Sequence, residues 1–202
     1  REKEFYKKKR KKLLLTDSFY KFISKKVKKS KKLFGVALAD SNKVDFFSTF
    51  KVDFFKIINR DLIQKKLVKE IYKSPVKKVY VSTGKSKIQD LRKHMSFLSK
   101  SEKKKLVFIH TSFTDNFRKI NLNSIKYIKD KLKTKVGYGN HSKFKELLLL
   151  SLSYNPFAIL FYVRGYKKVL HPDQNHSIEL LKVEKLVNYI KDIQLSFGKY
   201  VK

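Results

Sequence analysis

Cysteine and tryptophan are absent from this 202-residue chain, and proline and glycine are scarce, at three and six residues. The absence of cysteine excludes disulfide bonds, zinc sites with cysteine ligands and a cysteine nucleophile. No run of about 18 uncharged apolar residues occurs, so we expect neither a transmembrane helix nor a membrane partner. The first residues are charged throughout and do not have the pattern of a signal peptide, so we expect a cytoplasmic protein.

Acidic residues are few: 17 Asp and Glu stand against 50 Lys and Arg, which gives a formal net charge of +33. Such a charge favours non-specific binding to polyanions such as RNA. However, only six of the basic residues are arginine, the preferred residue for bidentate phosphate recognition, and the lysines are spread along the chain. A solvated lysine-rich surface therefore remains an alternative. The densest basic run, Lys7 to Lys12, makes residues 1–14 a candidate basic arm or simply a solvated terminus.

Six short runs of β-branched and aromatic residues alternate with amphipathic stretches. We expect strands at 33–37, 54–58, 79–82, 106–110, 135–138 and 158–162, and helices at 19–30, 61–72, 87–98, 122–132, 144–152 and 178–195. Continuous apolar strands joined by helices are typical of a parallel sheet in an α/β protein. Two architectures fit this pattern, an open doubly wound sheet and a (β/α)8 barrel without its first two units. No glycine-rich phosphate fingerprint follows a strand, so a dinucleotide site has no support.

Polar side chains follow these strands where each ends, the edge at which parallel barrels carry their chemistry. Lys56 lies inside the apolar run Phe-Phe-Lys-Ile-Ile, where a buried ammonium requires an anionic partner. Asp61 and Ser177 have an alternative interpretation as helix caps, and His110 as a core histidine. A lysine, hydroxyls, histidines and a carboxylate at one edge together predict a site for an anionic, phosphorylated substrate and a divalent metal.

The order and spacing of several short motifs resemble one known family. The stretch 33–57 keeps Asp40, Val44-Asp45-Phe46 and Lys56-Ile57, and the later matches are Val81-Ser82-Thr83-Gly84, Ile109-His110-Thr111, Val136-Gly137-Tyr138-Gly139-Asn140-His141-Ser142, Pro172-Asp173 and Ser177. Together they resemble the sialic acid synthases, which condense phosphoenolpyruvate with N-acetylmannosamine or a related N-acetylated sugar and release phosphate. The resemblance covers nearly the whole chain from about residue 15.

The resemblance implies a (β/α)8 TIM-type barrel, here incomplete. We expect about six βα units over residues 15–202, with the first two strands missing and the C-terminal antifreeze-like domain of the family absent. It also implies an enzyme, a carbon–carbon bond-forming transferase with small-molecule substrates and a divalent metal, Mn²⁺ or Mg²⁺. The residues to which it gives roles are Lys56, Asp61 and Asp173 in catalysis, Lys56, Asn59, Ser82, His110 and Ser177 in substrate binding, and His141 in metal binding.

Several family positions are changed in this sequence. The second metal-binding histidine of the family aligns with Tyr162, a poor ligand for a divalent ion at neutral pH, so we expect weakened metal binding. Two alternatives to a working synthase stay open: a catalytically degenerate barrel that serves as a binding or assembly partner, and a lysine-rich polyanion-binding protein. A homodimer is also compatible with the sequence, and the unpaired edges of a six-strand sheet predict association of this chain.

Overall fold

A computed structural model describes residues 15–165 and 173–198. The expected basic arm, residues 1–14, and Pro172 therefore lie outside the described residues. Six parallel strands form one sheet in the order β1-β2-β3-β4-β5-β6. Their bounds are β1 Gly35–Leu38, β2 Phe54–Ile57, β3 Lys78–Ser82, β4 Leu106–Ser112, β5 Lys135–Asn140 and β6 Ile159–Leu160. A second parallel pair follows, β7 Tyr162–Arg164 with β8 Ser177–Glu179.

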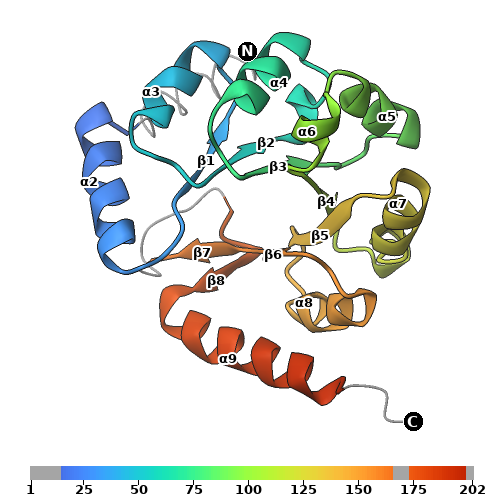
Figure 1. The fold of residues 1–202 in the computed structure, drawn as a ribbon. Helices are drawn as coiled ribbons and strands as arrows, with labels where there is room; N and C mark the ends of the chain where they lie inside the picture. The colour runs from blue at the N-terminus through green and yellow to red at the C-terminus, as the bar shows by residue number, and fades with distance from the viewer. Residues whose placement is uncertain (1–14, 166–172, 199–202) are drawn as a thin grey trace, which may run out of the picture.

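The sheet is curled into an incomplete barrel, and the helices surround its outside (Figure 1). Their bounds are α2 Asp17–Lys29, α3 Val44–Ser48, α4 Lys65–Lys73, α5 Ile88–Ser96, α6 Lys100–Lys103, α7 Ser124–Leu132, α8 Glu146–Ser151 and α9 Leu180–Ser196. Four 3₁₀ turns complete the connections, η1 Ser41–Lys43, η2 Asn59–Asp61, η3 Phe117–Lys119 and η4 Leu152–Tyr154. None of the helices in the described ranges combines the length and the apolarity needed to cross a membrane.

The main core lies between the outer face of the sheet and the helices. Phe55, Val81 and Phe108 are fully buried there, and they alternate along their strands with residues of the opposite face. Amphipathic helices cover this layer, as in α4, where Leu67 and Ile71 are fully buried and lie one turn apart. Burial of the outer face thus fixes which side chains of each strand point into the hollow of the curl.

The predicted strands are confirmed, with shifts at their ends. The first strand runs over Gly35–Leu38, and the expected strand at 158–162 is split between β6 and β7. The expected helix at 61–72 begins only at Lys65, because Asn59–Asp61 form a 3₁₀ turn. The expected last helix begins at Leu180, because residues 177–179 pair with β7 as a strand. The cap interpretations are consequently wrong: Gln64 stands at the cap of α4, and Glu179 at the cap of α9.

Candidate functional site

Strand register places a set of the expected site residues on one face, the hollow of the curl. Lys56 is level with Tyr80 on β3, and Ser82 follows two residues later on the same face. Ser82 on β3 is level with Ile109 on β4. Thr111, two residues further along β4 and therefore on the same face, is level with Gly139 on β5. Because side chains alternate along a strand, His141 continues the same face past the end of β5. The register therefore places Lys56, Ser82 and His141 on the same face of the sheet.

Lys56 lies half-buried in the middle of β2. Burial lowers the pKa of its ammonium from the usual value. Within the described ranges its Nζ makes no hydrogen bond or ion pair. A buried ammonium without an anionic neighbour is costly to the folded state, and an anion in the hollow would remove that cost. Lys56 is accordingly the strongest candidate for an anion-binding side chain.

His141 lies within electrostatic range of Lys56. Burial, followed by the charges of Lys56 and His176, lowers the pKa of His141 to about 4. Its imidazole is therefore neutral at neutral pH and carries a lone pair on one ring nitrogen. The ring is held by Phe113, whose centroid is 4.4 Å away, and by Tyr162 at 5.1 Å.

His176 joins this cluster from the turn that precedes β8. Its ring centroid lies 5.4 Å from that of His141 and 4.8 Å from that of Tyr162. Its Nε2 is 3.3 Å from Oδ1 of Asp173. The two atoms are within ion-pair distance but do not form a hydrogen bond, so the buried Nε2 has no hydrogen-bond partner. Asp173 also helps to raise the pKa of Tyr162, after burial of the phenol itself. Asp173 and His141 thus lie at one cluster of rings, and Lys56 acts on His141 through its charge.

Asp115 adds a second carboxylate at this rim. Its Oδ1 accepts hydrogen bonds from the Lys143 backbone N–H, at 2.9 Å, and from Ser142 Oγ, at 2.8 Å. These bonds lower the pKa of the Asp115 carboxyl, with smaller contributions from the charges of Lys143 and His176. The carboxylate therefore stays ionised while it links the loop after β4 to the loop after β5.

Ser177 and Asn59 are held by the scaffold. Ser177 is buried at the start of β8, level with Tyr162, and its hydroxyl donates to the Gln174 carbonyl. Asn59 donates to the Thr83 carbonyl and to Ser86 Oγ. Gly84 has a φ of +50°, and a Cβ there would lie 2.5 Å from Cγ of Asn59. Asn59 thus positions the turn after β3.

Asp61 and His110 are placed differently from the hollow-facing residues. Asp61 is buried in η2, and its Oδ2 lies 3.3 Å from Nε of Arg60. His110 is level with Tyr138 on the helix side of the sheet, and its Nε2 donates to the Ile120 carbonyl at 2.9 Å. Burial lowers the pKa of His110. The structure therefore does not bring His110 onto the face that carries Lys56.

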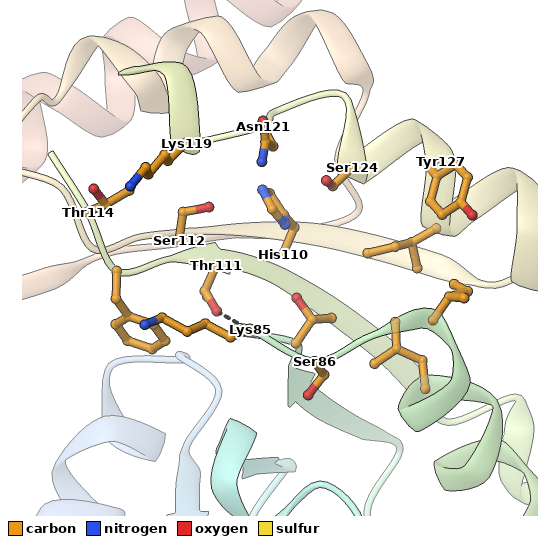
Figure 2. Close-up of a pocket in the computed structure, with 16 residues that line it drawn as sticks. Lys85, Ser86, His110, Thr111, Ser112, Thr114, Lys119, Asn121, Ser124 and Tyr127 are labelled. Carbon is orange, nitrogen blue, oxygen red and sulfur yellow. Dashed lines mark hydrogen bonds between the residues drawn. The ribbon is translucent and has the colours of Figure 1, made fainter. Parts of the chain in front are cut away.

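His110 instead lines a separate cavity of about 500 Å³ between the β3–α5 and β4–α7 connections. Figure 2 shows Lys85, Lys119, several hydroxyl side chains and the amide of Asn121 around it. No carboxylate is among its lining residues. Phe113, which also lines the cavity, packs against His141, so the two sites are neighbours.

A divalent metal at His141 has few protein ligands to draw on. In the described ranges, no three His, Asp or Glu side chains lie together in a way that could hold an ion. The buried Nε2 of His176, which has no hydrogen-bond partner, is the one observation in the described ranges that fits a metal ligand. The donors are therefore of the right chemical kind for a site with two imidazoles, in which other ligands complete the coordination shell.

The sequence analysis did not single out His176 or Asp115. A signal for His176 was present, because it stands three residues after Asp173 in a polar turn. Its contribution depends on the pairing of β7 with β8. The sequence did not predict β8, because the helical pattern of the following residues extends over it. Asp115 gave no signal, because its role depends on contacts with Ser142 and Lys143 across two loops.

Comparison with known proteins settles the family. A family model described as the NeuB family matches residues 1–202. The chain belongs to the NeuB family. A curated relative, the N,N'-diacetyllegionaminic acid synthase of Campylobacter jejuni, is 25% identical over 126 residues, covering 60% of this chain and 38% of that protein. The chain thus spans well under half the length of that relative.

Solved structures agree on the fold. The N-acetylneuraminic acid synthetase of Leptospira borgpetersenii, in complex with citrate, superposes with a TM-score of 0.84 at 21% identity, over 93% of this chain and 66% of that one. A truncated 3-deoxy-D-arabino-heptulosonate 7-phosphate synthase from Thermotoga maritima has a TM-score of 0.80 at 11% identity, over 94% and 76%. The predicted resemblance and the incomplete α/β barrel are both confirmed.

Proposed function

We propose that this chain takes part in a sialic acid synthase-type condensation of phosphoenolpyruvate with an N-acetylated amino sugar, with release of phosphate. The observation that carries the proposal is Lys56, a half-buried ammonium without an ionic partner in the described ranges that faces the hollow beside His141. The family membership and the relatives named above support the same reaction class.

Lys56 would bind the negatively charged groups of phosphoenolpyruvate. A phosphate or carboxylate beside Nζ raises the pKa of the amine back towards its usual value, and the ammonium offsets the charge that gathers on the phosphoryl group as it leaves. Ser82, on the same face two residues beyond Tyr80, would donate its hydroxyl to the same substrate. These two residues thus form the proposed phosphoenolpyruvate end of the site.

His141 and Asp173 would form the sugar end. In the reaction, the methylene carbon of phosphoenolpyruvate bonds to the aldehyde carbon of the sugar, and the aldehyde oxygen gains a proton. Water then adds to the former enol carbon, and the bond to phosphate breaks. Asp173, beside His176, would orient the sugar and the attacking water. His141, neutral in the folded protein, would bind a Mn²⁺ or Mg²⁺ ion. When bound, such an ion polarises a carbonyl oxygen.

Two measurements test the proposal. Phosphate release from phosphoenolpyruvate, with an N-acetylated hexosamine and Mn²⁺, should depend on both substrates. Calorimetry should show that Lys56→Ala abolishes phosphoenolpyruvate binding, while Lys66→Ala, at an exposed position of α4, leaves it unchanged. Equal affinities of the two variants would refute the role of Lys56. Binding without phosphate release would favour the degenerate barrel.

A further inference from the structure

We propose that His176 and His141 together hold one divalent metal ion, so that His176 takes over the place that the family pattern gives to residue 162. The inference rests on the proposed function for its choice of ion. It concerns a residue that the resemblance does not assign, and it starts from the buried Nε2 of His176, which has no hydrogen-bond partner.

The spacing of the two imidazoles suits a shared ion. With metal–nitrogen bonds of about 2.1 Å, two histidines on one ion place their ring centres about 5 Å apart. The centroids of His141 and His176 are 5.4 Å apart. In the described ranges no hydrogen bond of the His141 ring nitrogens is found either, so both rings have a donor atom to offer.

The contact between His176 and Asp173 points the same way. Their atoms Nε2 and Oδ1 lie 3.3 Å apart without hydrogen-bond geometry. Asp173 therefore does not satisfy Nε2 through a hydrogen bond, and Nε2 remains available to an ion. A buried polar nitrogen without a hydrogen bond is unfavourable, and a metal ion would satisfy it.

Tyr162 explains why a second histidine is needed here. Its ring lies against both imidazoles, at 5.1 Å from His141 and 4.8 Å from His176. A phenol is a poor ligand at neutral pH, since its unperturbed pKa is about 10. The pairing of Tyr162 with Ser177 brings residue 176 to the neighbouring strand end. His176, which lies next to Tyr162, would thus supply the imidazole that position 162 lacks.

The coordination shell would be completed by water or substrate. No three His, Asp or Glu side chains in the described ranges could hold an ion together. Mg²⁺ commonly keeps several waters beside one or two protein ligands, and Mn²⁺ accepts similar surroundings. The site would consequently bind the ion weakly and leave coordination positions for water or an oxygen of the sugar.

Binding of Mn²⁺ to the 202-residue chain, measured by electron paramagnetic resonance without substrates, tests the proposal. We expect His176→Ala and His141→Ala each to weaken binding at least about 10-fold. Tyr162→Phe keeps the ring packing and should bind as the wild type does. Circular dichroism checks the fold of each variant. If His176→Ala unfolds, electron spin echo modulation of the wild-type Mn²⁺ complex should still show two coordinated imidazole nitrogens.

Several results would overturn the inference: wild-type affinity in His176→Ala, loss of binding in Tyr162→Phe, a single coordinated nitrogen, or no Mn²⁺ binding by the wild type. The outcome is independent of turnover. Two-nitrogen Mn²⁺ binding without phosphate release would uphold the role of His176 and count against the proposed reaction. Phosphate release that is unchanged in His176→Ala would support the proposed reaction and count against the role of His176.

Discussion

His94 is a fully buried histidine on α5 whose protonation should control acid stability. Its Nδ1 donates to the Leu62 carbonyl at 2.7 Å, and its Nε2 is 3.3 Å from the hydroxyl of Tyr72. Burial lowers the pKa of His94 from 6.5 to about 4, although the Leu62 carbonyl acts in the opposite direction. The ring is therefore neutral in the folded protein over the whole physiological range.

The pKa difference determines both the sign and the size of the effect. Below pH 6.5 the unfolded chain takes up a proton at His94, whereas the folded protein does so only near pH 4. Stability is therefore lost as the pH falls through this window. With one pKa unit worth about 1.4 kcal/mol, the loss from His94 at pH 5 is about 2 kcal/mol.

Urea unfolding at pH 7.5 and pH 5.0 measures this loss directly. We compare the wild type with His94→Gln, because glutamine keeps a donor for the Leu62 carbonyl and does not titrate. The wild type should lose about 2 kcal/mol more than the variant between the two pH values. Other histidines, His141 included, contribute equally to both proteins and cancel. Equal losses in the two proteins would refute the assignment.

Three further predictions concern backbone, charge and edges. Gly84→Ala should destabilise the fold by about 2 kcal/mol in urea unfolding, because φ is +50° and the new Cβ would meet Asn59, whereas Gly165→Ala, with no atoms within 4 Å, should be neutral. Retention on an RNA column should fall steeply with salt for a chain of net charge +33, and salt-independent retention would contradict this. Sedimentation should show self-association through exposed strand edges, and a clean monomer would contradict that.

The sequence was informative where the chemistry follows from the order of the strands. Parallel strands bring their carboxyl ends to one edge, so Lys56 and His141 could be predicted to lie near each other without coordinates. Lys56 also stood out because a lysine is rare inside an apolar strand. The βα alternation left both an open sheet and an incomplete barrel possible, and the resemblance to the sialic acid synthases decided for the barrel.

His110 and His176 could not be placed in the same way. Alternation within a strand does not say which residues of the next strand share its face until the register is known, and the register puts His110 opposite Tyr138. The position of His176 depends on β8, a strand of three residues directly before α9. The sequence pattern assigned most of these residues to the helix that follows.

The hydrogen bonds from Ser142 and Lys143 to Asp115 have a practical consequence for anyone who wishes to redesign the mouth of this barrel. They connect two loops from different βα units. Replacing the sequence of one loop alone would therefore remove the hydrogen bonds that hold the other loop in place. New specificity would have to be introduced by exchanging both loops as a matched pair.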